Sequence, residues 1–115
     1  MHIDIVIVNW NAGFLIKECI DSIIKFKSTS VSKIIVVDNN STDGSENFLD
    51  NYTEVTLIRA GENLGFGKAC NLGASLCQAE FILFLNPDTQ LRSSTLRKVL
   101  TYMHEEKNAK VGICG

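Results

Sequence analysis

The sequence has no long apolar run, little excess charge and a single proline. No apolar run approaches the roughly 18 residues that a membrane span needs. The 115 residues carry 11 basic and 13 acidic side chains, so a net charge of -2 gives no electrostatic basis for a nucleic-acid partner. Met1 precedes an apolar strand pattern almost directly, so we expect no secretory signal peptide. A length of 115 residues allows one globular domain at most.

The four cysteines include no C-x-x-C pair. Cys70 and Cys77 are expected on one helix, about 10 Å apart along its axis, which is too far for a disulfide. We interpret Cys19, Cys70, Cys77 and Cys114 as buried thiols that serve as small apolar residues. Free thiols are typical of a reducing compartment, so we expect a cytoplasmic protein.

Three short apolar runs each end in a cluster rich in Asn and Asp. Runs of this length with many β-branched residues are typical of buried strands. Ligands of parallel sheets bind beyond the carboxyl ends of the strands. We therefore expect strands that deliver polar side chains to one edge of a sheet. The runs and their clusters are residues 3–8 with 9–11, residues 34–37 with 38–44, and residues 81–85 with 86–89.

Helical periodicity alternates with these strands. Helices are expected over residues 14–26, 45–52, 67–78 and 93–106, the last capped by Ser93 or Ser94. Further strands are expected over residues 55–59, at or near an edge, and from Lys110. The alternation predicts an α/β fold with three layers, α/β/α, around a mostly parallel, Rossmann-like sheet. Because residues 111–115 look like a strand leaving the sheet, we expect the N-terminal part of a longer protein.

Asp38 follows the second apolar run and allows two interpretations. An acid at a strand end can accept a hydrogen bond from the imide N–H of uracil or thymine. It can equally close an Asx-turn or cap the next helix. Trp10, after the first run, either lines a base pocket or packs in the interior.

The segment from Asn63 to Asn71 contains two glycines and a lysine before a helix. Gly65 and Gly67 would let the backbone approach a ligand, and a helix start with Lys68 offers N–H groups and a cation to phosphate. The segment does not fit the nicotinamide-cofactor or P-loop patterns. The alternative is a tight loop that caps the helix.

The segment Asn86-Pro87-Asp88 follows the third run. Pro87 fixes the backbone there, and the Asp88 carboxylate could hold Mg²⁺ or Mn²⁺ together with waters and a diphosphate. The alternative is a turn that precedes a helix.

In chain order, four motifs resemble those of family 2 glycosyltransferases, and most closely their rhamnosyltransferase-like branch. The resemblance spans essentially the whole chain, and the four motifs in order are far more specific than any one of them. The motifs are Asn9-Trp10-Asn11, then residues 36–45 (VVDNNSTDGS), then Asn63-Leu64-Gly65-Phe66-Gly67 with Asn71-Leu72-Gly73, then Phe84-Leu85-Asn86-Pro87-Asp88.

The resemblance implies a GT-A fold, a nucleotide-sugar donor linked to UDP or dTDP, a Mn²⁺ or Mg²⁺ ion, and inversion at the anomeric carbon. Rhamnose is one candidate sugar, and a saccharide or lipid-linked acceptor in cell-surface polysaccharide synthesis is implied. Residues 1–115 would be the nucleotide-sugar-binding part, without the acceptor-binding part. The resemblance assigns the metal to Asp88 and the nucleotide to Asn9, Trp10, Asn11, Asp38, Asn40, Asn63, Gly65, Gly67, Lys68 and Asn86.

Two departures from the family pattern qualify these expectations. Asn86 replaces the first acid of the D-x-D motif, which lowers the local negative charge. The family's catalytic base lies further along the chain, so we expect none before Gly115 and no sugar transfer by these residues alone.

The alternative is a nucleotide-binding or assembly module without catalysis. A receiver domain fits less well, because Asn9 and Asn11 stand where its acidic pair would lie. We also expect a homodimer through the sheet edge exposed around Phe81–Leu85 and Val111–Cys114. The full-length protein would be peripheral at the inner face of the plasma membrane.

Overall fold

The computed structural model describes residues 2–27 and 30–105. Within them, four strands form one parallel sheet in the order β3-β2-β1-β4. The strands are β1 (Ile3–Asn9), β2 (Val31–Asp38), β3 (Val55–Arg59) and β4 (Phe81–Leu85). The helices are α1 (Leu15–Phe26), the 3₁₀-helix η1 (Ser45–Leu49), α2 (Phe66–Ala74) and α3 (Thr95–His104).

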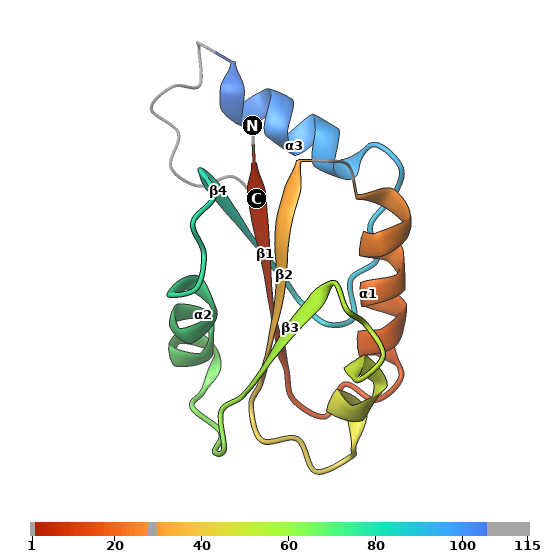
Figure 1. Ribbon diagram of the computed structural model, residues 1–115, viewed down its shortest axis with the longest axis vertical. Helices are drawn as coiled ribbons and strands as arrows, with labels where there is room; N and C mark the ends of the chain where they lie inside the picture. Colours follow the sequence, from red (N-terminus) through yellow and green to blue (C-terminus); the bar gives the residue numbers. More distant parts are fainter. Residues whose placement is uncertain (1, 28–29, 106–115) are drawn as a thin grey trace.

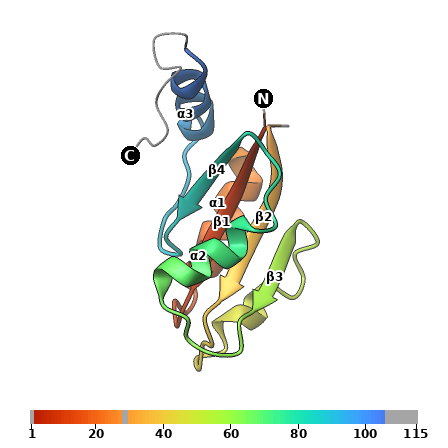
Figure 2. The same ribbon diagram turned by 90° about the vertical axis from the view of Figure 1, so that its left-hand side faces the viewer.

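The helices lie on both faces of the sheet, as Figures 1 and 2 show. Helices α1 and η1 cover one face, and α2 covers the other. Helix α3 lies at the upper end of Figure 1, near the starts of the strands, whereas the loops after β1, β2 and β3 gather at the lower end. The predicted three-layer α/β fold is therefore confirmed, and its polar loops share one edge of the sheet.

The central strand β1 is buried on both faces, which explains why its residues are apolar except for Asp4 and the final Asn9. Successive side chains of a strand point to opposite faces. Ile5 and Ile7 therefore join the core under α1, whereas Val6 and Val8 join the core under α2. Strand β2 alternates in the same way. The same alternation continues into the polar residues that follow each strand, and it determines on which face of the sheet each of them lies.

The strands expected over residues 3–8, 55–59 and 81–85 are confirmed to within one residue, whereas β2 begins at Val31, three residues before the expected run over residues 34–37. Several helix ends also differ. The expected helix over residues 45–52 is the five-residue 3₁₀-helix η1, a form common in such short segments. Helix α2 ends at Ala74 instead of residue 78. Beyond it, the backbone N–H groups of Gln78 and Ala79 donate to the buried Asp4 Oδ2, at 2.9 and 3.1 Å, and replace helical hydrogen bonds.

The predicted cap of α3 is only partly correct. Ser94 stands at the capping position, but its side chain makes no capping hydrogen bond. Instead, the backbone N–H of Arg92 donates to Thr95 Oγ1 at 3.1 Å. The strand expected from Lys110 lies outside the described residues.

The cysteines were expected to be buried, and this is correct for Cys19 alone among those described. Cys19 is fully buried, whereas Cys70 and Cys77 are half-buried, and all three are free thiols. Cys77 follows the end of α2 and does not share that helix with Cys70, while Cys114 lies outside the described residues. None of the described helices has the length and apolarity to cross a bilayer.

Gly73 allows α2 to pack closely on the sheet, which gives a testable prediction. A Cβ at this position would lie 2.5 Å from Val6 Cγ1 and 3.2 Å from Val37 Cγ2. Overpacking of this kind costs about 1–3 kcal/mol. We expect Gly73→Ala to lower the free energy of unfolding by that amount, measured by urea unfolding. In the same helix, a Cβ at Gly67 would meet nothing within 4 Å, so Gly67→Ala should not destabilise; equal losses in both variants would contradict the packing argument.

Candidate nucleotide-binding site

A cavity of about 380 Å³ lies at the carboxyl ends of the strands. We call it the strand-end cavity. Residues from four separate segments of the chain line it, and four of them, Trp10, Asn63, Gly65 and Asn86, were predicted as nucleotide-binding residues. The sequence predictions did not include the other four. The complete lining is Val8, Trp10, Asn39, Asn63, Gly65, Phe66, Asn86 and Pro87.

Two aromatic side chains line the cavity from different segments. Trp10 follows β1 and is 55% exposed, and Phe66 is the first residue of α2 and is 59% exposed. Large aromatic side chains bury much apolar surface in most folds, so two exposed rings at one cavity indicate a ligand or partner surface. The exposure of Trp10 decides against packing in the interior.

Asn9 and Asp38 lie in a buried polar network and do not line the cavity. Asn9 Nδ2 donates to Asp38 Oδ1 at 3.0 Å and to Ser45 Oγ at 2.9 Å. Ser41 donates to the same carboxylate twice, from Oγ to Oδ1 at 2.7 Å and from its backbone N–H to Oδ2 at 3.1 Å. Asp38 therefore closes a turn in its own loop, although through the N–H three residues on and not through the i+2 bond of an Asx-turn, and its contact with a base stays a prediction.

Asn11 joins the loop after β1 to the loop after β2. It has a left-handed backbone, with φ at 53°, and its Oδ1 accepts from the backbone N–H groups of Thr42 and Asp43 at 2.7 and 3.2 Å. The next residue but one, Gly13, donates its N–H to Asp43 Oδ2 at 2.9 Å. Asn40 is also left-handed, with φ at 67°, and is exposed. The loops that carry Trp10 and Asn39 are thus fixed to each other.

Asn39 is a lining residue that the sequence predictions missed. Its side chain is buried, and its Oδ1 accepts from the Leu64 N–H at 2.8 Å while its Nδ2 donates to the Gly65 carbonyl at 3.3 Å. It therefore connects the end of β2 to the loop before α2. Strand alternation was the available signal, because Asn39 continues the face of β2 that contains Ile35 and Val37.

The loop before α2 is shaped by Gly65, whose φ is 80° and ψ is 167°. Its N–H donates to Asn63 Oδ1 at 2.8 Å. Gly67 and Lys68 lie in the first turn of α2 and are exposed, next to the cavity in sequence but not in its lining. The helix start leaves N–H groups free for an anion.

Asp88 lies just after the cavity residues Asn86 and Pro87. It is exposed, in a turn in which the Thr89 N–H donates to the Asn86 carbonyl at 3.0 Å. The negative charge of Asp88 reaches the buried Cys19: burial first, and this charge second, raise the pKa of the Cys19 thiol to about 12. Cys19 therefore stays a neutral thiol beneath the Asp88 segment.

The described residues include no cluster of three or more His, Cys, Asp or Glu side chains that could enclose a metal ion. A single exposed carboxylate nevertheless fits Mg²⁺ or Mn²⁺ bound with a nucleotide, because these ions keep several waters and take other ligands from phosphates. The residue that could hold such an ion is Asp88.

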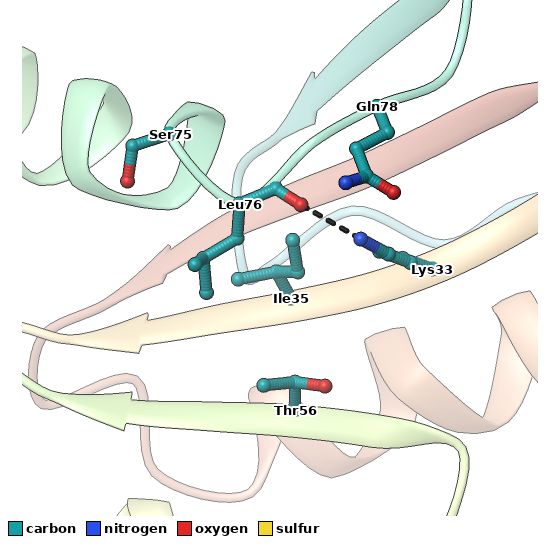
Figure 3. Close-up of a pocket in the computed structure, with 6 residues that line it drawn as sticks. All are labelled: Lys33, Ile35, Thr56, Ser75, Leu76 and Gln78. Carbon is teal, nitrogen blue, oxygen red and sulfur yellow. Dashed lines mark hydrogen bonds between the residues drawn. The ribbon is translucent and has the colours of Figure 1, made fainter.

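A second cavity, of about 300 Å³, lies on the α2 face of the sheet and contains no predicted site residue. Its one charged side chain is already used, since Lys33 Nζ donates to the Leu76 carbonyl at 2.8 Å, near the end of α2 (Figure 3). The lining consists of Lys33, Ile35, Thr56, Ser75, Leu76 and Gln78.

Comparison with known proteins identifies relatives over nearly the whole chain. The sequence matches Glycosyl transferase family 2 over residues 4–114. A poly(ribitol-phosphate) beta-glucosyltransferase of Bacillus spizizenii is 31% identical over 94% of this chain and 18% of that protein. The dTDP-rhamnosyl transferase RfbF of Shigella flexneri is 35% identical over 68% of this chain and 27% of that protein. The chain thus spans less than a third of the length of these relatives.

Solved structures show the same fold. Residues 1–349 of S. aureus TarS, in complex with UDP-GlcNAc, give a TM-score of 0.79 at 24% identity over 93% of this chain and 32% of that chain. The mannosyltransferase PcManGT of Pyrobaculum calidifontis, in complex with GDP-Man and Mn²⁺, gives 0.81 at 20% identity over 91% of this chain and 33% of that chain. These likenesses confirm the GT-A type of α/β fold.

Proposed function

Because the chain belongs to glycosyltransferase family 2, we propose that the strand-end cavity binds the nucleoside diphosphate of a nucleotide-sugar donor. The observation that carries the proposal is the cavity itself, with two exposed aromatic rings and three Asn side chains at the carboxyl ends of parallel strands. Ligands of open α/β sheets bind at this edge. TarS and PcManGT, which share the fold, were solved with nucleotide sugars.

We assign the base to the two rings and the phosphates to the start of α2. Trp10 and Phe66 provide apolar surface for a base, and the amides of Asn39 and Asn63 provide hydrogen-bonding groups beside it. The free N–H groups of the first turn of α2, with Lys68, suit the diphosphate. Asn9 and Asn11 fix the two loops that carry the cavity wall, and Asn40 lies exposed in a left-handed turn of the second loop, where its side chain is open to a ligand.

We assign a Mn²⁺ or Mg²⁺ ion to the Asp88 carboxylate, supported by the Mn²⁺ in PcManGT. When bound, such an ion neutralises charge on the departing nucleoside diphosphate. Asn86 contributes a neutral amide oxygen at most, so Asp88 supplies the protein's charge in this segment.

The whole protein, in this proposal, transfers the sugar with inversion to a saccharide or lipid-linked acceptor in cell-surface polysaccharide synthesis. The named activities of the relatives support this class, and RfbF supports rhamnose from dTDP-rhamnose as one candidate. We place the reaction in the cytoplasm because the described cysteines are free thiols, with peripheral attachment at the inner face of the plasma membrane.

We place the catalytic base outside these 115 residues. Asp43 is a candidate by position, but its two oxygens accept backbone N–H bonds from Ser45 and Gly13, at 2.9 Å each. The hydrogen bonds from Ser45, foremost, lower the pKa of the Asp43 carboxyl, which makes it a weaker base. The chain alone should therefore bind a donor nucleotide and transfer no sugar.

Calorimetric titration of the chain with UDP, dTDP and GDP, each with and without Mn²⁺, tests the proposal. We expect saturable binding of at least one nucleotide and tighter binding with Mn²⁺. Acceptor-dependent release of nucleoside diphosphate from UDP-sugars or dTDP-rhamnose would show instead that the catalytic groups lie within the chain. Binding that is unaffected by Mn²⁺, with no transfer by any longer form of the protein, would favour the module without catalysis.

Strand β4 should promote self-association of the chain. Among the described residues β4 pairs with β1 alone, and Ile82 and Phe84 are 38% and 47% exposed on it. Unpaired apolar edges recruit other chains. We expect sedimentation to show a fraction of dimer that increases with protein concentration. In Phe84→Lys the dimer dissociation constant should rise. A strict monomer at high concentration would contradict this expectation.

A further inference from the structure

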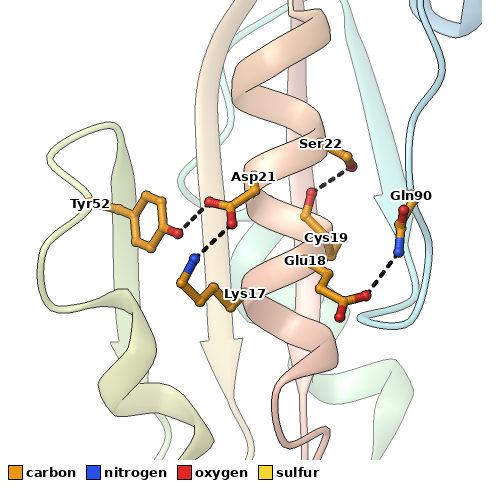
Figure 4. A network of polar contacts seen from close by, with 7 residues as sticks. All are labelled: Lys17, Glu18, Cys19, Asp21, Ser22, Tyr52 and Gln90. Atoms are coloured by element: carbon orange, nitrogen blue, oxygen red, sulfur yellow. Dashed lines mark hydrogen bonds and ion pairs between the residues drawn. The ribbon is translucent and has the colours of Figure 1, made fainter.

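Helix α1 holds the segment that follows Asp88. Three of its residues, Glu18, Cys19 and Ser22, contact residues 86–91. Figure 4 shows these three residues on one side of the helix, with the contact between Glu18 and Gln90. The segment between β4 and α3 has no helix or strand of its own, so these contacts decide where it lies.

Ser22 makes the central contact. Its Oγ accepts from the Leu91 backbone N–H at 2.9 Å and donates to the Cys19 carbonyl, one helical turn back, at 2.7 Å. Both contacts are buried, and the Leu91 side chain packs in the core with Ile16 and Ile20. The hydroxyl therefore supplies the polar partner that the Leu91 N–H needs inside an apolar environment.

Ser22 has the only hydroxyl among the buried side chains of α1. The other buried residues of the helix are apolar or thiol side chains, and Ser is not favoured in helix interiors. A buried Ser among them indicates that a buried polar group needs a hydrogen-bond partner there, and that group is the Leu91 N–H.

A second, exposed contact acts on the same segment. Gln90 Nε2 donates to Glu18 Oε2 at 3.0 Å, and the Cys19 Sγ lies 3.9 Å from the Asn86 carbonyl oxygen. The segment is thus held on both sides of Asp88 along the chain: before Asp88 by the end of β4, and after it by the contacts of Gln90 and Leu91 with α1.

We propose that Ser22 is a positioning residue for the metal-binding carboxylate: by fixing Leu91, it sets the place of Asp88, which directly follows the cavity residues Asn86 and Pro87 in the chain. This inference rests on the proposed function, since it takes Asp88 as the metal ligand. Loss of the Ser22 hydroxyl leaves Asn86 attached to the end of β4 but removes the buried hydrogen bond that fixes the backbone after Asp88, where the Leu91 side chain and the exposed Gln90–Glu18 contact remain. The metal-dependent part of nucleotide binding should therefore weaken more than the metal-independent part.

The test measures the affinity of the chain for UDP by calorimetry, with and without Mn²⁺. The ratio of the two dissociation constants is the gain from the metal. Ser22→Ala should reduce this gain on the order of tenfold, while the affinity without metal changes less than about twofold. Ser22→Thr keeps the hydroxyl and should restore most of the gain.

Two control variants separate positioning from a general loss of stability. Ser75→Ala removes a hydroxyl that donates to a carbonyl of its own helix, Leu72, at 2.6 Å, and that contacts no other segment through a described hydrogen bond. Ile23→Val weakens the core under α1 without a polar contact to residues 86–91. Both should keep the gain of the parent chain.

If Ser22→Ala does not fold, Glu18→Ala provides the second variant, with Glu18→Gln as its conservative partner. Glu18→Ala should lower the gain about twofold, as the loss of one exposed hydrogen bond would. An unchanged gain in Ser22→Ala and Glu18→Ala, with the gain lost in Asp88→Ala, overturns the positioning role alone. No gain from Mn²⁺ in the parent chain overturns the metal assignment, and this inference with it.

Discussion

Replacement of Asp88 by alanine is expected to abolish the gain in nucleoside diphosphate affinity that Mn²⁺ gives. Asp88 is the one carboxylate of residues 86–91, and the neighbouring Asn86 has no charge with which to replace it. A charge-assisted contact contributes about 1.5–3 kcal/mol, so affinity at saturating Mn²⁺ should fall on the order of tenfold or more. Calorimetric titration with UDP and dTDP measures the change.

Asp88→Asn is the sharper variant, because it keeps the size of the side chain and removes only the charge. Asp50→Asn is the matched control: Asp50 is also an exposed acid, but it lies after η1 and pairs with Arg59 at 3.7 Å. The gain should be lost in Asp88→Asn and kept in Asp50→Asn. A parent-like Mn²⁺ response in both Asp88 variants would remove this residue from the metal site.

Asp38→Ala is expected to destabilise the protein strongly and to weaken nucleotide binding. The Asp38 carboxylate is buried and accepts hydrogen bonds from the Asn9 amide and from the N–H and hydroxyl of Ser41. Removal leaves these donors without their acceptor, at a cost of about 2–4 kcal/mol. The loops that carry Trp10 and Asn39 would lose the buried part of the contacts that join them and keep only the exposed bonds of Asn11 and Gly13, so we expect affinity to fall at least about tenfold.

Urea unfolding and calorimetry test the two effects of Asp38→Ala separately. Asp43→Ala is the matched control, because Asp43 also accepts backbone hydrogen bonds but is exposed, and its loss should change stability far less. Asp38→Asn keeps one acceptor and should be intermediate in stability. An unfolding midpoint unchanged in Asp38→Ala would show that the buried network does not hold the loops.

The strands could be predicted from sequence because each contains a short, mostly apolar run that is followed by polar or turn residues. The ends of the helices could not, since their partners lie far away in the sequence. Helix α2 stops at Ala74 because Asp4, on β1, takes the N–H groups of Gln78 and Ala79. Nothing near residue 74 in the sequence indicates that contact.

The site was predictable as a region and less so as a set of side chains. Strand alternation explains the difference: Asn9 and Asp38 continue the α1 face of their strands, whereas Trp10 and Asn39 continue the α2 face, where the cavity lies. In the polar cluster after β2, the charge of Asp38 favoured that residue as the ligand contact. The alternation of β2 instead indicates Asn39, because Asn39 continues the face on which the cavity lies.

The central claim is that a nucleotide base binds at Trp10 in the strand-end cavity. Trp10 is the only tryptophan of the chain, so its fluorescence reports on this position alone. Titration with UDP or dTDP in the presence of Mn²⁺ should quench that fluorescence saturably, with a midpoint that matches the calorimetric dissociation constant and shifts to higher concentration in Phe66→Ala. Calorimetric binding without any change in Trp10 fluorescence would contradict the account, because the nucleotide would then lie elsewhere on the protein.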